Sequence, residues 1–426
     1  MSKRPPSKTD AENLPFAETV ESTPPEMVTD LIARAIGLGA SDLFLASNEE
    51  HLEVAVRRHG LLRPVATVGP EFGKRCLAYI KTQAQMDVTE RRRPQDGRWA
   101  FTAPGGRGID IRINSIPTLH GEDFALRLLE RDNKLLSVQH LGMLQRDLNS
   151  LLGMLNAPSG LILVSGPTGS GKTTTLYNCL RELANGQRKI NTIEDPIEYS
   201  LENIRQSQVS LAAEVGFPEL LRSVLRQAPD VIMVGEIRDT ETALIAVQAA
   251  NSGHLVLATL HAPITSAAVQ SLLGFGIQPY MLATSLIGIV SQRLVRRLCP
   301  ETRIPVDITM FEEMFNEVRG MLRPGEGEKI YAPNPKSSTS PDGYVGRLGI
   351  FEVMPISSAI RGLIVRKQPS HVIRAKAIEE GMVGLRQAAL VAIARGETSV
   401  EELFRCIPSE YLESSDVDHE HVMKAE

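Results

Sequence analysis

One short stretch constrains the fold of this chain more than any other: the sequence GPTGSGKT at residues 166–173. It matches the phosphate-binding loop pattern G-x-x-x-x-G-K-[ST]. The apolar, β-branched run at residues 161–165 comes directly before it and predicts a buried parallel strand, while residues 174–184 predict a helix. A strand, a glycine-rich loop and a helix in this order predict an α/β domain organised around a polyphosphate site.

Each part of this loop has a chemical reason. Backbone N–H groups and the positive end of the helix dipole face the phosphates, and glycines let the backbone approach because they carry no Cβ. Lys172 adds a positive charge, and Thr173 adds a hydroxyl for Mg²⁺. The strand-to-helix context disfavours a purely structural turn. The predicted nucleotide-binding residues are Gly166, Pro167, Thr168, Gly169, Ser170, Gly171, Lys172, Thr173 and Thr174.

Length and charge narrow the class of protein. The chain has 426 residues, more than one average domain, and a net charge of −5 with both signs dispersed. No basic surface is indicated, so no nucleic acid partner is expected and a helicase is disfavoured. The start of the chain lacks the apolar run of a signal peptide, and no apolar stretch approaches the ~20 residues that span a bilayer. We therefore expect a cytoplasmic protein, peripherally associated with a membrane complex if it acts at a membrane.

The four cysteines, Cys76, Cys179, Cys299 and Cys406, are scattered and form no C-x-x-C pair. This spacing predicts free, mostly buried thiols in a reducing compartment, with neither a disulfide framework nor a metal site.

The chain divides into four segments. Residues 1–26 are polar and rich in proline and predict a flexible tail, and the acidic residues 409–426 predict another. Residues 27–132 combine helical periodicity with short alternating runs and predict a small α+β domain. Residues 133–408 alternate strands with helices and then end in helices, which predicts a mostly parallel sheet covered on both faces. Its predicted strands are 161–165, 189–193, 231–234, 255–259 and 346–353, and a helix is predicted around 311–322.

Acidic residues follow two of these predicted strands. Glu194, Asp195 and Glu198 follow the second strand, and Glu236 follows the third. Ligands of parallel sheets lie beyond the carboxyl ends of the strands. Hydrolysis of a nucleoside triphosphate needs one carboxylate to hold Mg²⁺ and one to orient or deprotonate water, and Glu236 and Glu198 are the candidates. The alternative, that these acids only cap helices, is strongest for Glu194 and Asp195.

Two histidines flank the fourth predicted strand. A histidine at a strand end is more often structural than functional, and His254, at the amino end, keeps that interpretation. His261 lies at the carboxyl end, beside the phosphate loop, which favours a functional role. Arg112 and Arg127 lie in alternating strands of the small domain, where the residues alone indicate only a solvated face.

Four ordered runs resemble the Walker A, Asp, Walker B and His boxes of the secretion ATPase superfamily, the hexameric motors of type II secretion and type IV pili. The resemblance extends from about residue 30 to 407, and residues 276–280 and 292–300 are more similar to the assembly and secretion branch than to the retraction branch. The four boxes are residues 166–173, 192–199, 234–239 and 253–261, and residues 93–97, 110–118 and 121–129 resemble the family's N-terminal domain.

The resemblance implies a RecA-like P-loop ATPase domain preceded by a small PAS-like domain. It implies that Glu198 is the general base, that Glu236 is the Mg²⁺-linked acid, and that His261 senses the nucleotide state. It also implies that Arg112 and Arg127 reach the phosphates from the N-terminal domain. ATP and Mg²⁺ are the implied cofactors, and the implied partners are identical subunits in a hexamer and a polytopic inner-membrane platform protein. Arg238 stays open between a site role and a salt bridge.

One departure concerns zinc. Members of the secretion branch often carry a four-cysteine zinc module after the His box, but here Cys299 stands alone and a cysteine-free loop replaces the later pair. Zinc is therefore not expected.

The functional hypothesis is a hexameric, Mg²⁺-dependent ATPase that powers pilus or pseudopilus assembly, or secretion, through an inner-membrane platform. Three alternatives stay open at this point: a pilus retraction ATPase, a conjugation or nucleic-acid-transport ring motor, and a nucleotide-binding scaffold that has lost turnover.

Overall fold

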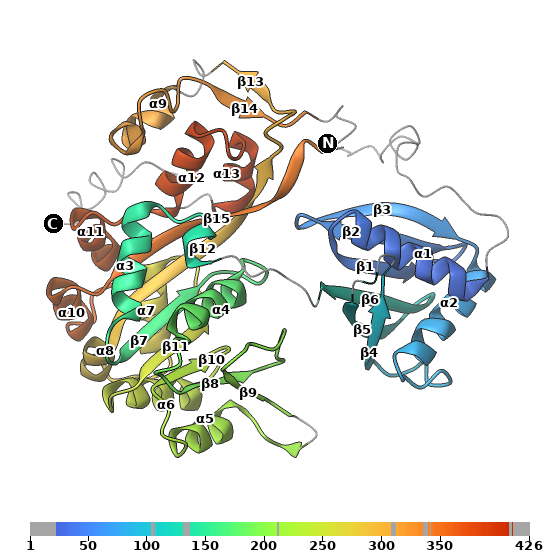
Figure 1. The fold of residues 1–426 in the computed structure, drawn as a ribbon, viewed down its shortest axis with the longest axis horizontal. Coiled ribbons are helices and arrows are strands. Elements are labelled where there is room, and N and C mark those ends of the chain that lie inside the picture. The colour runs from blue at the N-terminus through green and yellow to red at the C-terminus, as the bar shows by residue number, and fades with distance from the viewer. Residues whose placement is uncertain are drawn as a thin grey trace. The chain divides into compact units, whose positions relative to one another are not determined.

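The computed structural model describes residues 23–103, 106, 108–130, 137–210, 213–307, 312–334, 340, 342–408 and 411. Most of both predicted tails lies outside these residues. The chain forms two compact units, which meet in sequence at residues 134 and 135 and are described separately below (Figure 1).

The first unit is a six-stranded antiparallel sheet with two helices packed on one face. Alternate strand residues are buried beneath the helices, which is the period-two pattern of a sheet with one open face. The strand order is β3-β2-β1-β6-β5-β4. The elements are α1 (Pro24–Gly37), β1 (Ala40–Ser47), β2 (Leu52–Arg58), β3 (Leu61–Val68), α2 (Pro70–Gln83), β4 (Gln95–Thr102), β5 (Gly108–Thr118) and β6 (Gly121–Glu130).

Two details of this unit differ from the prediction. Helix α1 begins at Pro24, inside the predicted tail, because Thr23 and Glu26 form a capping box. Strand β3 was not predicted, since Pro64 weakens its strand signal. It is an edge strand, where a residue without an N–H donor is tolerated.

The second unit contains a seven-stranded sheet in the order β15-β12-β7-β11-β10-β8-β9. All neighbouring strands in it are parallel except β12 and β15, which pair antiparallel. A doubly wound, mostly parallel sheet is therefore confirmed. The strands are β7 (Gly160–Ser165), β8 (Ile190–Glu194), β9 (Arg205–Gln208), β10 (Val231–Val234), β11 (Leu255–Leu260), β12 (Leu286–Leu298) and β15 (Tyr344–Pro355).

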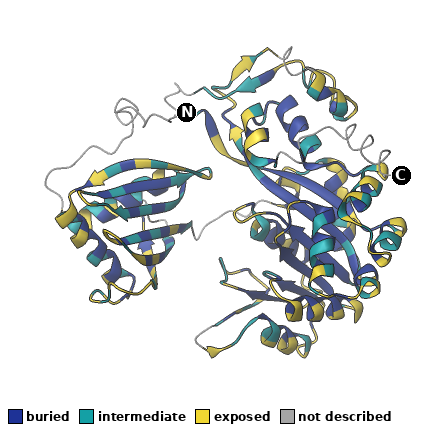
Figure 2. Ribbon diagram, turned by 180° about the vertical axis from the view of Figure 1, so that it is seen from behind, coloured by how far each residue is buried: buried dark blue, intermediate teal, exposed yellow. Residues whose placement is uncertain are grey.

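Both faces of this sheet are buried. Along β7, Leu161 and Leu163 join one core while Ile162 and Val164 join the other, so an unbroken apolar run is what the strand requires. Figure 2 shows these strands as buried, with the exposed residues on the helices around them. Helices α3 (Gln145–Leu155) and α4 (Lys172–Leu183) cover one face. The other face is covered by α5 (Phe217–Leu225), α6 (Thr240–Asn251), α7 (Thr265–Gly274), α8 (Pro279–Ser285), α10 (Ser358–Val365) and α11 (Ser370–Glu379).

Strands β12 and β15 continue into a separate helical core with α12 (Leu385–Ala394) and α13 (Val400–Cys406). Arg296 on β12 binds the fully buried Glu402 of α13 through its backbone N (2.7 Å), Nε (2.9 Å) and Nη2 (2.8 Å). This ion pair joins the long strand to the C-terminal helices.

The less regular region after Cys299 carries a two-stranded sheet of β13 (Ile304–Val306) and β14 (Ile330–Ala332). The helix predicted over 311–322 is only partly correct. One α-turn, α9 (Glu312–Phe315), is followed by the 3-10 segment η5 (Asn316–Met321). Within the described residues, Cys76, Cys179 and Cys299 are buried, Cys406 is half-buried, and all four are free thiols, as predicted. No helix in the described part of the chain has the length and apolar character to cross a bilayer.

Candidate functional site

The predicted site residues gather at one edge of the parallel sheet. Strands β7, β11, β10 and β8 are consecutive neighbours, and each carries a motif at its carboxyl end. The phosphate loop follows β7, His261 follows β11, Glu236 follows β10, and Glu194 ends β8. Parallel strands end at the same edge, so motifs far apart in sequence become neighbours.

The phosphate loop has the backbone conformation that its glycines predict. Gly166 has a φ of 148° and Gly171 a φ of 89°, which is the left-handed region. A Cβ on Gly166 would lie 2.6 Å from the carbonyl O of Gln292 and 2.6 Å from Ser170 Oγ. Gly171 is the N-cap of α4, which begins at Lys172, two residues before the predicted start. The loop therefore ends in the helix N-terminus that binds anions.

Lys172 folds back over this loop. Its Nζ donates to the carbonyl O of Gly166 (2.9 Å) and of Pro167 (3.1 Å). Burial lowers the pKa of Lys172, the carboxylate of Glu236 raises it, and the charge of Arg293 lowers it again. The ammonium is thus placed among the loop carbonyls and within electrostatic reach of the Glu236 carboxylate.

The other loop residues differ in exposure. Pro167, Thr168 and Gly169 are exposed, as is Thr174, while Thr173 is half-buried in the first turn of α4. Ser170 is buried, and its hydroxyl has no hydrogen-bond partner among the described residues.

Gln292 supports the loop from β12, and sequence reasoning missed this role. Its Nε2 donates to the carbonyl O of Ser170 (2.6 Å), and its Oε1 accepts from Thr175 Oγ1 (2.7 Å). Gln292 is 1% exposed. A glutamine within the mostly apolar run 286–295 is a signal that could have pointed to it, because buried amides need partners.

Glu236 is the centre of an ion-pair cluster. Its Oε1 lies 2.5 Å from His261 Nε2, and its Oε2 accepts from both Nε and Nη2 of Arg238 at 2.6 Å. Arg238 Nη1 also lies 3.7 Å from Asp195 Oδ2. The structure thus places Arg238 in a salt bridge between the two acidic motifs. His261 is 49% exposed at the edge of the sheet, where a ligand could reach it.

Glu194 and His254 bind other groups of the protein. Glu194 caps no helix, so that alternative was wrong for it: its buried carboxylate accepts hydrogen bonds from Tyr177, Thr192 and Gln206. His254 lies at the amino end of β11, where its Nδ1 is 3.0 Å from the carbonyl O of Ala249.

Glu198 is half-buried, and its backbone N donates to Tyr177 Oη (3.3 Å).

Arg112 and Arg127 lie directly opposite each other on the open face of the first unit's sheet. Arg98 stands opposite Arg112 on the other side, which makes a cross-strand row of three arginines. Like charges in directly opposed positions are destabilising, so this row concentrates positive charge on the face at some cost in stability. Asp42 continues the row, and its Oδ1 accepts from Arg127 Nε (3.3 Å).

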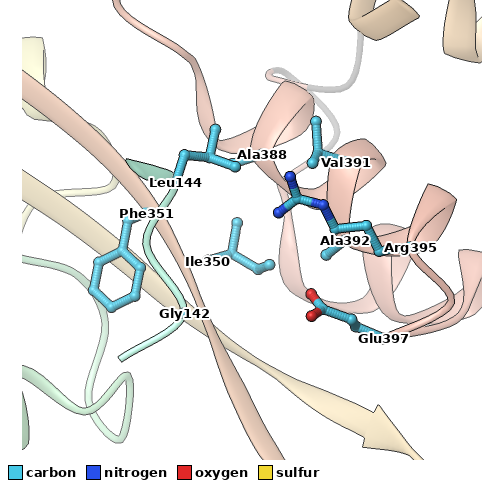
Figure 3. Close-up of a pocket in the computed structure, with 9 residues that line it drawn as sticks. All are labelled: Gly142, Leu144, Ile350, Phe351, Ala388, Val391, Ala392, Arg395 and Glu397. Carbon is cyan, nitrogen blue, oxygen red and sulfur yellow. The ribbon is translucent and has the colours of Figure 1, made fainter. Parts of the chain in front are cut away.

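A small pocket lies elsewhere in the second unit (Figure 3). It contains none of the predicted site residues, and its volume of ≈ 10 Å³ leaves room for about one water molecule. Most of its lining residues are of apolar type and several belong to the helical core, while Arg395 and Glu397 lie at one side. The lining residues are Gly142, Leu144, Ile350, Phe351, Ala388, Val391, Ala392, Arg395 and Glu397.

The donor set at the sheet edge fits ATP with Mg²⁺. The left-handed glycines clear space that a Cβ would fill, and the unpartnered Ser170 hydroxyl adds a polar group to the cradle. The described residues hold no group of three or more His, Cys, Asp or Glu side chains placed to bind a metal by themselves. Mg²⁺ bound with a nucleotide needs no such group, because phosphates and water supply most of its ligands.

This fold and this site define a P-loop ATPase with a RecA-like domain. A family model described as "Type II/IV secretion system protein" matches residues 18–405. The chain belongs to this family of secretion system proteins. Among curated relatives, the type II secretion system protein E of Dickeya dadantii is 40% identical over 384 residues, covering 90% of this chain and 76% of the relative. The type II secretion system ATPase E of Vibrio cholerae is 38% identical over 382 residues, covering 89% and 74%.

Solved structures agree with this assignment. The pilus retraction motor PilT with bound ADP is 26% identical, with a TM-score of 0.57 over 90% of this chain and 100% of that one. The ATPase DotB of Legionella pneumophila has a TM-score of 0.68 over 92% and 98%, at 19% identity, which shows the shared fold. The α/β RecA-like fold class is therefore confirmed, and the chain is an ATP hydrolase of the secretion ATPase type.

Proposed function

We propose that this chain is a hexameric ATPase motor that powers pilus or pseudopilus assembly, or protein secretion, through a polytopic inner-membrane platform protein. It would act in the cytoplasm, associated with the inner membrane through that partner. The observation that carries the proposal is the convergence of the four motifs on one sheet edge. The relatives named as type II secretion ATPases support the choice of process.

The loop residues bind the triphosphate in the proposed mechanism. The N–H groups at the start of α4 and the Nζ of Lys172 hold the β- and γ-phosphates, and Lys172 exchanges its loop carbonyls for phosphate oxygens. Thr173 and Glu236 would hold Mg²⁺, directly or through water. Mg²⁺ neutralises charge on the phosphates when it is bound there.

Glu198 then accepts a proton from a water molecule whose oxygen attacks the γ-phosphorus. The bond between that phosphorus and the β–γ bridging oxygen breaks, and the products are ADP and phosphate. Arg112 and Arg127 are proposed to stabilise the charge of the transferring phosphoryl group. His261 is bonded to Glu236 and is proposed to respond to the loss of the γ-phosphate by changing that contact.

Turnover measurements test the two central roles. Glu198→Gln should lower kcat by about 10²-fold or more while ATP still binds, because only the proton acceptor is removed. Lys172→Ala should abolish tight binding. Glu202→Gln is a matched control, since Glu202 is exposed and lies four residues after Glu198. Hydrolysis at the wild-type rate by Glu198→Gln or by Lys172→Ala would refute the assignment.

A second experiment tests the arginines. Arg112→Ala and Arg127→Ala should each lower kcat by about 10³-fold or more, as loss of a transition-state arginine does. Arg75→Ala, on the exposed side of α2, should leave kcat unchanged. If all three variants behave alike, the row on the open sheet face has no part in hydrolysis.

The similarity to PilT keeps a retraction motor as the second candidate. A deletion strain separates the two. Loss of surface fibres or of secretion supports assembly, whereas a strain that makes fibres but cannot withdraw them supports retraction. Native mass spectrometry with ATP tests the hexamer. Turnover stimulated by single-stranded DNA would instead support a nucleic-acid-transport ring.

A further inference from the structure

A buried hydrogen-bond network lies beneath the segment that carries Glu198. Its centre is Glu194, which is 3% exposed. One carboxylate oxygen accepts from Thr192 Oγ1 (2.6 Å) and from Gln206 Nε2 (3.0 Å), and the other accepts from the hydroxyl of Tyr177. Three donors satisfy this carboxylate inside the protein, so its function is internal rather than toward a ligand.

Tyr177 carries this network to the backbone of Glu198. The side chain is fully buried on α4. Because its hydroxyl proton is donated to Glu194, the hydroxyl oxygen can accept, and it lies 3.3 Å from the backbone N of Glu198. Burial, together with the hydrogen bond to Glu194, raises the pKa of Tyr177, so the hydroxyl stays protonated.

Gln206 fixes two further backbone groups of the same segment. Its Oε1 accepts from the N of Leu201 (2.7 Å), and its Nε2 lies 3.2 Å from the carbonyl O of Tyr199. The backbone is therefore attached to side chains at Glu198, Tyr199 and Leu201. A segment outside regular secondary structure needs such contacts to hold one conformation.

Helix α4 joins this network to the phosphate loop. The helix begins at Lys172, and Tyr177 follows five residues later, about 7.5 Å along the axis. One rigid element thus presents the phosphate-binding groups at its start and the anchor of the Glu198 segment on its side. The distance between phosphate and base is set through this helix.

We infer that Tyr177, held by Glu194, is a positioning residue that fixes Glu198 relative to the phosphate loop. This inference rests on the proposed role of Glu198 in hydrolysis. The alternative is that Tyr177 has only a packing role in the core, since its ring packs edge to face on Tyr199 with the ring centroids 4.7 Å apart. Substitution of Tyr177 by phenylalanine distinguishes the two roles, because it keeps the ring and removes only the hydroxyl.

The first test is the turnover of Tyr177→Phe. We expect kcat to fall about 10- to 100-fold with KM for ATP unchanged, because small displacements of a catalytic group have effects of that size. Tyr199→Phe is the matched control. It removes the hydroxyl of the ring that packs on Tyr177, for which the described residues show no hydrogen-bond partner, and it should keep the wild-type kcat. Gln206→Ala is a second test, since it removes the side chain that binds the backbone at Tyr199 and Leu201 and leaves the packing of the two rings intact. It should likewise lower kcat and leave KM for ATP unchanged.

A double-mutant cycle excludes a merely structural role. If Tyr177 acts through Glu198, then Tyr177→Phe added to Glu198→Gln should not lower the residual rate further. Losses that multiply in the double variant, or wild-type kcat in both Tyr177→Phe and Gln206→Ala, would overturn this inference and leave the proposed function intact. Wild-type turnover in Glu198→Gln alone would overturn the proposed function, and this inference with it.

Discussion

Replacing Gln292 by leucine tests whether the phosphate loop depends on β12 for its shape. The amide of Gln292 is buried and binds the carbonyl O of Ser170 and the hydroxyl of Thr175. Leucine has a similar volume and cannot form either bond. The change therefore leaves two buried polar groups without partners while the packing is nearly conserved.

The cost follows from these two contacts. A buried polar group that loses its partner costs about 1–3 kcal/mol, so Gln292→Leu should lower the unfolding free energy by about 2–6 kcal/mol. For a domain of this size, each kcal/mol corresponds to a fall of about 2–4 °C in Tm. The midpoint should thus fall by at least about 4 °C. ATP affinity should fall as well, because Ser170 then loses the bond that orients its peptide within the loop.

Calorimetry and nucleotide titration measure both effects. Thr175→Val combined with Gln292→Leu supplies the internal control: with both partners apolar, the penalty for the orphaned Thr175 hydroxyl disappears. The double variant should therefore be more stable than the sum of the two single losses predicts. A Gln292→Leu protein within about 0.5 kcal/mol of wild type, or strict additivity in the pair, would show that the loop holds its shape without β12.

Four further predictions concern three other positions and zinc. Gly166→Ala should abolish the thermal shift produced by ATP, because its Cβ would lie 2.6 Å from a backbone carbonyl of β12; Gly169→Ala, with open space around it, is the milder control. Burial raises the pKa of Asp147 to about 7, above that of an unfolded chain, so the native state holds one proton more between about pH 4 and 7 and loses stability as pH rises through that window. Asp147→Asn should therefore be more stable than the wild type, and the difference in unfolding free energy should grow toward roughly 4 kcal/mol as the pH rises from 5 to 8. Thermal melts of both proteins across this range measure the difference, and a difference that does not change with pH would contradict the prediction. Tyr331→Ala should lower the unfolding free energy by about 0.5–2 kcal/mol, because the guanidinium of Arg303 stacks 4.1 Å from the centre of that ring. Because no zinc is expected, a chelator should not shift the midpoint of thermal unfolding, and elemental analysis should find no zinc.

The sequence predicted a helix or strand correctly where one hydrophobic pattern extends over the whole element. Strands β7, β10 and β11 are almost entirely apolar, which is the pattern that parallel strands covered on both faces require. Strand β12 was not predicted because Gln292 and Arg293 interrupt its apolar pattern, although both side chains are buried against specific partners. A single helix was predicted around residues 311–322, and the periodicity of that segment could not distinguish a 3-10 turn from an α-helix.

The same limit applies to the site. Sequence could place Lys172, Glu236 and His261 at one edge, because each follows a parallel strand. It could not supply the contacts made across long separations. Gln292 reaches Thr175 over 117 positions, and Tyr177 reaches Glu194 from a helix on the face of the sheet. Such partners depend on how elements pack, and no local pattern of residue types records them.

Strand β12 also has a mechanical consequence. Gln292 is bonded to the phosphate loop, and Arg296, four residues further on, is bonded to α13, so the two attachment points lie about 13 Å apart on one extended backbone. Between these two residues β12 pairs with β15 alone, since its pairing with β7 ends at Ser291, and an extended, hydrogen-bonded backbone stretches or compresses little. The first interruption of regular pairing with β15 comes only after Arg296, at the register shift before Leu298. A small movement of the loop as phosphate leaves would therefore be delivered to the C-terminal helices at nearly full amplitude, and bending would begin beyond that bulge.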